Sequence, residues 1–114
     1  MTRAAIAVNR IGDRVTVGTL RQALADGDQP TQMWAIRNLG QLEDRASVDL
    51  LVDRLRHEDS TDRVRRAAAT ALAKLGDPRA LDPLRRAHDE ATGFTRRRIG
   101  RALAELESRL GSPR

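Results

Sequence analysis

Apolar residues in the middle of the chain recur at positions i, i+3, i+4 and i+7, which is the stripe of an amphipathic helix. The residues of this stripe are Ala68, Ala71, Leu72 and Leu75. Three further residues, Leu81, Leu84 and His88, continue the spacing after a short break. The pattern therefore predicts two consecutive helices, over residues 62–75 and 78–89.

The residues between these two helices favour a tight turn. Gly76 suits the left-handed backbone conformation that ends many helices. Asp77 stands where its carboxylate can accept backbone N–H bonds of the next helix, and Pro78 fits the first helical position because no donor is missed there. The pair is therefore predicted to fold back as a helical hairpin.

The same pattern returns along the chain. Leu39, Leu72 and Leu103 occupy matching places 33 and 31 residues apart, and a step of 31 back from Leu39 reaches Val8. Self-similarity at such a period predicts an all-α fold of stacked hairpins. The expected helices are the pairs 2–11 with 14–25, 31–42 with 45–57, and 62–75 with 78–89, then a single helix over 95–109.

Length and composition agree with one such stack. A chain of 114 residues with 2% aromatic residues can build only a thin core of Ala, Leu, Ile and Val, and it has no cysteine. We expect a single domain made of units at about 1–28, 29–60 and 61–91 and a half unit at 92–110. In the last helix, Phe94, Thr95 and Ile99 are spaced like a hydrophobic staple around a cap.

The stretch from Val64 to Leu84 contains the elements "VRRAA", "AL", "LGDPRAL" and "PL". It resembles the HEAT-like repeat of phycobilisome-lyase-type proteins and of many small bacterial solenoids. The resemblance implies a short right-handed α-solenoid of about three HEAT-like hairpins plus a C-terminal capping helix. It also implies a scaffold that binds macromolecules, with first helices on the convex side and second helices on the concave side.

The same stack also occurs in enzymes, so fold alone does not decide activity. Proteins similar to deoxyhypusine hydroxylase carry paired His-Glu dipeptides that hold two irons, whereas here only His57-Glu58 has that form and His88-Asp89 comes nearest to it. An open metal site needs three or more converging ligands. We therefore expect no catalytic residues, no metal, no cofactor and no enzymatic activity.

Two surfaces stand out as candidate binding sites. Protein partners often bind at tryptophan, and Trp34 takes a place that Arg3, Ala67 and Arg98 fill in the other units. Trp34 is expected either to contact a partner or to cover the seam between the first two units. The charged positions of the expected second helices vary between repeats. The predicted partner-binding residues are Trp34, Asp49, Asp53, Asp82, Arg85 and Arg86.

The second surface is a ridge of stacked arginines in the opening turns of two neighbouring first helices. Its predicted residues are Arg65, Arg66, Arg96, Arg97 and Arg98. Arginines there commonly bridge adjacent repeats through a carboxylate, or they bind an acidic partner, phosphate or RNA. The net charge of +5 allows polyanion binding, although nearly all basic residues are Arg, a bias that a GC-rich genome also produces.

The hypotheses are then a non-catalytic protein-binding scaffold, which we favour, and a nucleic-acid or polyanion binder that works through the arginine ridge. The apolar run at residues 4–8 is too short for a signal peptide or a membrane span. The chain is accordingly expected in the cytoplasm, away from membranes, with another protein as partner. Partner identity and oligomeric state stay open.

Overall fold

The computed structural model describes residues 13–56 and 60–111, with only the backbone described for residues 13–16. The α-helices are α2 (Asp13–Asp26), α3 (Gln29–Gln41), α4 (Val48–Arg56), α5 (Asp62–Leu75), α6 (Leu81–Glu90) and α7 (Gly93–Gly111). Short 3-10 turns, η1 (Arg45–Ser47) and η2 (Pro78–Ala80), lead into α4 and α6. All regular elements in this described part are helical, which confirms the predicted fold class.

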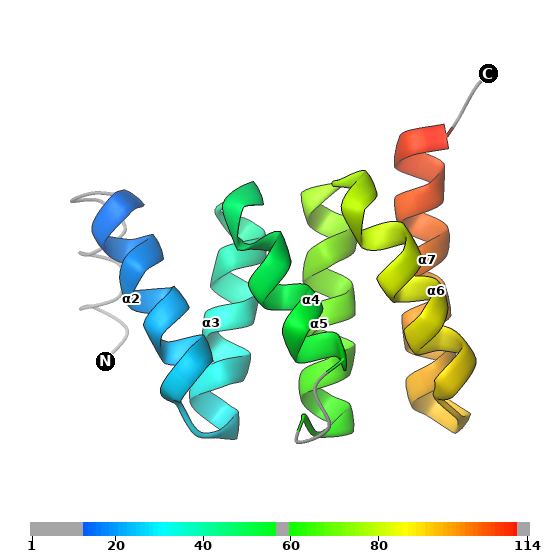
Figure 1. Cartoon of the computed structure of the whole chain (residues 1–114), viewed down its shortest axis with the longest axis horizontal. Helices are drawn as coiled ribbons and strands as arrows, with labels where there is room; N and C mark the ends of the chain where they lie inside the picture. The colour runs from blue at the N-terminus through cyan, green and yellow to red at the C-terminus, as the bar shows by residue number, and fades with distance from the viewer. Residues whose placement is uncertain (1–12, 57–59, 112–114) are drawn as a thin grey trace.

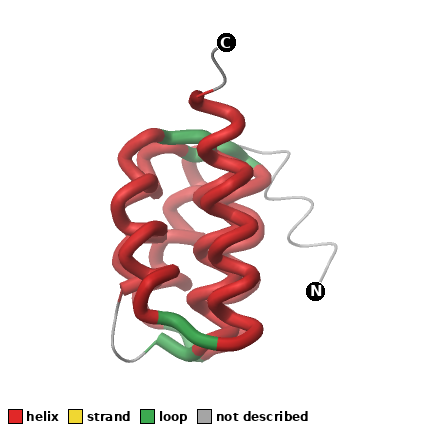
Figure 2. Tube along the Cα trace, turned by 90° about the vertical axis from the view of Figure 1, so that its right-hand side faces the viewer, coloured by secondary structure: helices red, strands yellow, loops and turns green. Residues whose placement is uncertain are grey.

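The helices form two layers (Figure 1). The second-helix layer contains α2, α4 and α6, and the first-helix layer behind it contains α3, α5 and α7. Seen along the stack, each hairpin places one helix in each layer (Figure 2). The described chain is thus a short α-solenoid, as the repeat spacing predicted, and the helix expected over residues 2–11 lies outside the described residues.

A continuous seam of aliphatic residues joins the layers. The matching residues Leu39 and Leu72 are fully buried, whereas Leu103, at the same place in the last helix, is only partly buried. Leu106, one turn further along that helix, is fully buried. Ala68 and Ala71 are also buried and keep α5 close to its neighbours. Because α5 packs against α3, α4 and α7, it is the central helix of the described stack.

The predicted turn between α5 and α6 is present, but Asp77 caps the 3-10 turn η2, and α6 begins only at Leu81, three residues after the expected start at residue 78. Gly76 has a φ of +67°, and its N–H donates to the Leu72 carbonyl. Asp77 is buried, and its Oδ1 accepts the backbone N–H of Arg79 at 2.9 Å. The Arg79 guanidinium also donates to the Asp77 carboxylate, with Nη2 2.9 Å from Oδ2. These bonds lower the pKa of Asp77, the side-chain bond from Arg79 most and its backbone N–H next.

The start of α7 corrects the sequence analysis. The helix begins at Gly93, two residues before the expected cap, so Thr95 lies inside its first turn. Ile99 is buried, but Phe94 is 54% exposed and so does not form the expected staple with it. The phenyl ring is therefore available to a surface site.

Candidate functional site

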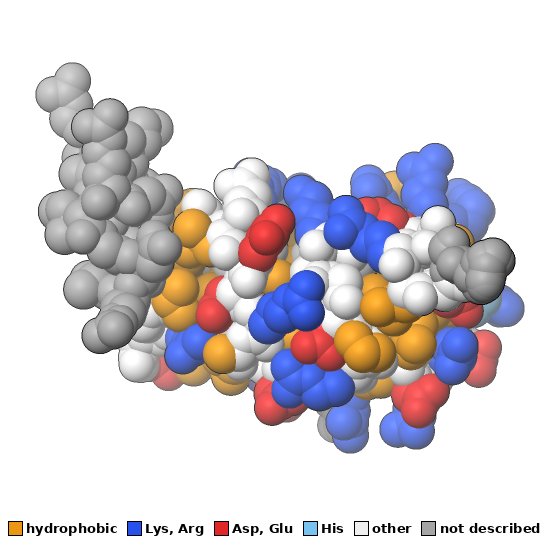
Figure 3. Space-filling view, turned by 90° about the horizontal axis from the view of Figure 1, so that it is seen from above, with side chains coloured by type: hydrophobic (Ala, Val, Ile, Leu, Met, Phe, Trp, Pro, Cys, Tyr) orange, Lys and Arg blue, Asp and Glu red, His pale blue; other side chains and the backbone are white. Residues whose placement is uncertain are grey.

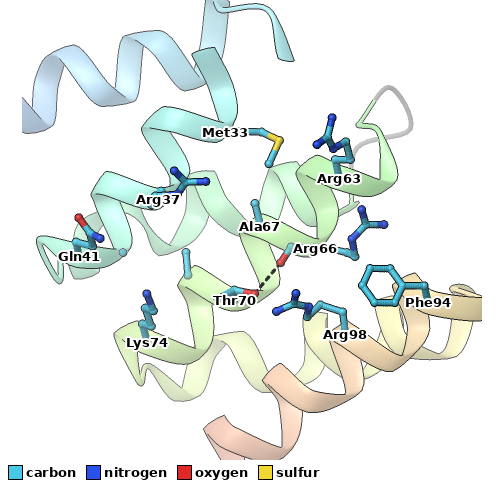
Figure 4. A pocket seen from close by; sticks show the side chains of 12 residues that line it. Met33, Arg37, Gln41, Arg63, Arg66, Ala67, Thr70, Lys74, Phe94 and Arg98 are labelled. Atoms are coloured by element: carbon cyan, nitrogen blue, oxygen red, sulfur yellow. Dashed lines mark hydrogen bonds between the residues drawn. The ribbon is translucent and has the colours of Figure 1, made fainter. Parts of the chain in front are cut away.

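A groove of about 370 Å³ crosses the first-helix layer. Side chains from three helices line it (Figure 4). We call it the basic groove. Its residues are Met33, Arg37, Gly40 and Gln41 of α3, Arg63, Arg66, Ala67, Thr70, Ala71 and Lys74 of α5, and Phe94 and Arg98 of α7.

Small residues make this hollow possible. Gly40, Ala67 and Ala71 line the groove without side chains long enough to fill it. At Gly40, helices α3 and α5 approach so closely that a Cβ added to the glycine would lie 3.1 Å from the Ala71 Cβ. The long side chains of the remaining residues therefore stand around a shallow space between α3, α5 and α7 (Figure 4).

The charge of the groove has one sign. Five of its residues are cations and none is acidic; the cations are Arg37, Arg63, Arg66, Lys74 and Arg98. Across the chain's described ranges, none of these five side chains forms an ion pair. Figure 3 views the molecule from the end that carries the α3–α4 and α5–α6 turns. In this view basic side chains predominate along the edge of the first-helix layer, whereas acidic and basic ones alternate along the opposite edge. The groove is thus suited to an anion.

Phe94 gathers guanidinium groups at one end of the groove. The Cζ atom of Arg66 lies 4.9 Å from the ring centroid, and those of Arg98 and Arg97 lie at 5.9 and 6.0 Å. Such cation–π contacts contribute about 0.5–1 kcal/mol each at exposed sites. Arg66 is held further, because its Nη1 donates to the buried Thr95 hydroxyl at 3.0 Å. We call these four residues, Phe94 with Arg66, Arg97 and Arg98, the Phe94 cluster.

The five arginines of the predicted ridge do not form one surface. Arg66 and Arg98 line the basic groove. Arg97 lies beside Phe94 but does not line the groove. Arg65 lines a smaller pocket of about 260 Å³ and pairs with Asp62 at 3.4 Å. Arg96 is exposed on α7.

The expected carboxylate bridge between repeats is wrong for Arg66. Among the described residues, its inter-repeat hydrogen bond goes to the Thr95 hydroxyl, and its guanidinium lies over Phe94. A neutral partner leaves the positive charge uncompensated, so Arg66 still attracts an anion.

The predicted partner-binding residues divide between the layers. Trp34, 41% exposed, lies on α3 in the first-helix layer, whereas the other five lie on α4 and α6 in the second-helix layer. The structure therefore does not bring Trp34 together with Asp49, Asp53, Asp82, Arg85 and Arg86.

Most of the second-helix candidates already have ionic partners within the chain. Arg85 lies 3.2 Å from Asp82 and 3.4 Å from Glu107. Asp53 lies 2.6 Å from Arg54, and Asp49 lies 3.7 Å from Arg79. Exposed pairs of this kind contribute about 0–1 kcal/mol, yet they leave this surface balanced in charge.

Sequence reasoning did not assign Arg37, Lys74 or Phe94 to a binding site. A signal was present on α5, where residues 63, 66, 67, 70, 71 and 74 follow helical spacing, with basic residues at 63, 66 and 74 and small residues between them. The contributions of α3 and α7 depend on how the repeats stack, which the spacing within one helix does not give.

The histidines do not assemble a metal site in the part of the chain that the structure describes. That part holds no group of three or more His, Cys, Asp or Glu side chains able to bind a metal ion. His88 Nδ1 lies 3.7 Å from Asp89, and its ring lies against Gly100. His57-Glu58 lies outside the described residues. The described donors therefore do not fit the two-iron arrangement considered from the sequence.

None of the described helices combines enough length with enough apolar character to cross a bilayer.

The chain is similar in sequence to known proteins. A family model described as HEAT repeats matches residues 2–63 and 17–104. A deoxyhypusine hydroxylase of Gallus gallus is 31% identical over 84 residues, which are 74% of this chain. The chain spans 28% of that relative's length.

The relative corrects one prediction from the sequence. We expected no enzymatic activity, and this expectation is contradicted by a similar protein that is named as a hydroxylase. The resemblance to repeats of the phycobilisome-lyase type is finer than the family match and stays a prediction.

Proposed function

This chain belongs to the HEAT-repeat family, and we propose that it is a helical-repeat scaffold that binds an acidic segment of another protein in the basic groove. The observation that carries the proposal is a groove lined by five cations and no carboxylate. Proteins that recognise acidic motifs commonly use such arginine clusters. The cytoplasmic location expected from the sequence stays a prediction.

The apolar residues of the groove favour a protein segment as its occupant. Met33 contributes a flexible thioether at one side, and Phe94 adds exposed apolar surface at the other. A segment with carboxylates and one apolar side chain could pair with the cations and cover these residues together.

Nucleic acid is the alternative occupant. Single-stranded binding normally needs a free aromatic face on which a base stacks. At Phe94 the ring is already surrounded by the guanidiniums of Arg66, Arg97 and Arg98, which leaves less of it for a base. The groove therefore favours the acidic segment, and an RNA oligonucleotide belongs in the test as a competitor.

The test measures fluorescence anisotropy of a labelled peptide rich in Glu and Asp with one Leu, against a peptide whose acids are replaced by Lys. We expect only the acidic peptide to bind. Its affinity should fall on the order of tenfold between low salt and about 0.5 M salt, because exposed charges are screened. Binding of neither peptide, or of both equally, contradicts the proposal.

A matched pair of variants locates the site. Arg37→Ala with Lys74→Ala removes two groove cations, and Arg85→Ala with Arg86→Ala removes two from the second-helix layer. The groove variant should bind the acidic peptide roughly 3- to 30-fold more weakly, the sum of two exposed ionic contacts, and the other less than about twofold. The reverse result would move the site to the second-helix surface, the position predicted from the sequence.

A further inference from the structure

The Phe94 cluster is more specialised than the rest of the basic groove. Three guanidiniums lie within 6.0 Å of one ring centroid. All three positive charges therefore gather around the same side chain, and like charges repel one another. In the described ranges no carboxylate forms an ion pair with any of the three, so a bound anion would relieve the repulsion.

The local backbone adds to this positive field. The cluster includes Phe94, Arg97 and Arg98 of the first two turns of α7, and the first turn of that helix contains no acidic residue. The N-terminal end of a helix carries a partial positive charge. Arginine side chains in that position are therefore unfavourable without an anion nearby.

Arg66 is held in place before any ligand binds. Its Nη1 donates to Thr95 Oγ1 at 3.0 Å, and the guanidinium lies over the phenyl ring at 4.9 Å. A guanidinium has five N–H donors in a planar fork, so the Thr95 bond leaves donors for a ligand. Holding the side chain beforehand reduces the entropy lost on binding. The arrangement suits a rigid anion with several acceptor oxygens.

We propose that the Phe94 cluster recognises a phosphate monoester, carried on a phosphorylated side chain within the acidic segment. A phosphate monoester has three strong acceptor oxygens and a charge near −2 at neutral pH, whereas a carboxylate has two oxygens and a charge of −1. Arg66 and Arg98 approach one ring from α5 and α7; the Arg66 guanidinium lies beside Phe94, and the Arg98 guanidinium extends toward Thr70 in the groove (Figure 4). This inference rests on the proposed function and narrows its ligand.

The experiment uses three labelled peptides that differ at one position, which holds phosphoserine, Glu or Ser. Measured by fluorescence anisotropy at constant ionic strength and pH 7.5, the phosphoserine peptide should bind about tenfold tighter than the Glu peptide. Equal affinity of the phosphoserine and Glu peptides would overturn the phosphate inference and leave the proposed function intact. If none of the three bound, the proposed function itself would fail.

Two further measurements distinguish recognition of the phosphate group from attraction to negative charge alone. The second pKa of a phosphate monoester is about 6, so at pH 5.5 the advantage of phosphoserine over Glu should shrink. Arg98→Lys keeps the charge but loses the planar fork, so it should weaken the phosphoserine peptide more than the Glu peptide and remove most of the advantage. Arg98 is exposed and far-UV circular dichroism checks that the variant is folded. An unchanged advantage in Arg98→Lys contradicts the role of the cluster.

Competitors separate the possible sources of phosphate. Inorganic phosphate should displace the phosphoserine peptide only weakly, because it lacks the carboxylates that reach the other groove cations. An RNA oligonucleotide that bound tighter than the phosphoserine peptide, and lost affinity in Arg98→Lys, would replace the phosphopeptide with nucleic acid as the ligand.

Discussion

Replacing Gly40 with Ala tests how closely the first-helix layer packs beneath the basic groove. An added Cβ would lie 3.1 Å from the Ala71 Cβ and 3.3 Å from its Cα. Carbon atoms prefer separations of about 3.5–4.0 Å, so α3 and α5 must move apart by a few tenths of an ångström. Ala71 is buried and belongs to the central helix, so it cannot yield as a surface side chain would.

The expected change in the free energy of unfolding is opposite in sign to the change that helix propensity alone predicts. Overpacking costs about 1–3 kcal/mol, and alanine returns up to about 1 kcal/mol as the better helix former. We expect Gly40→Ala to lower the free energy of unfolding by roughly 0.5–2 kcal/mol. Gly18→Ala is the matched control, because Gly18 lies exposed within α2 with nothing within 4 Å of its added Cβ.

Thermal and urea unfolding followed by far-UV circular dichroism measures both variants. Gly18→Ala should stabilise the protein by roughly 0.5–1 kcal/mol while Gly40→Ala destabilises it. If both substitutions raised stability equally, α3 and α5 would not approach as closely as described, and the reasoning about the groove floor would be refuted.

The remaining predictions concern the core and the turn. Leu72→Ala should lower the free energy of unfolding by roughly 2–5 kcal/mol because Leu72 is fully buried. The control Leu110→Ala, at a residue 40% exposed, should lower it far less. Equal losses in urea unfolding would disprove the repeat register. Asp77→Ala should cost about 0.5–2 kcal/mol, and Asp77→Asn less, since the amide oxygen still accepts the Arg79 N–H but loses the ion pair. The pKa of Asp77 is lowered in the fold from its ordinary value of 3.8, so the stabilisation that Asp77 provides is present above pH 3.8 and is lost as pH falls further. The Asp77→Asn variant should lack this acid-dependent loss of stability. An identical dependence of stability on pH in both proteins would contradict the ionic contact between Asp77 and Arg79.

Local signals predicted the fold well. Gly76, Asp77 and Pro78 determine their turn through backbone conformation and capping, which act over a few residues. The spacing of Leu39 and Leu72 predicted the stacked seam, because burial of one face requires apolar residues at helical intervals. Such effects are readable from the sequence since each depends on neighbours within one or two turns.

The binding site was predicted only in part, for a physical reason. Arg66 and Arg98 were expected in a basic surface, but their shared contact with Phe94 depends on the start of α7 and on its packing against α5. Phe94 was assigned to a staple because a cap at Thr95 also fitted the sequence. Arg37 enters the groove from a third helix, and only the stacking of repeats brings it there.

Chemical-shift mapping by nuclear magnetic resonance tests the central claim most directly, and a protein of 12.6 kDa suits the method. The labelled chain is titrated with the acidic peptide while backbone amide and arginine side-chain resonances are followed. The account predicts that the largest shifts occur around Arg37, Arg66 and Arg98 of the basic groove. Shifts confined to α4 and α6, around Asp49 and Arg85, would contradict it.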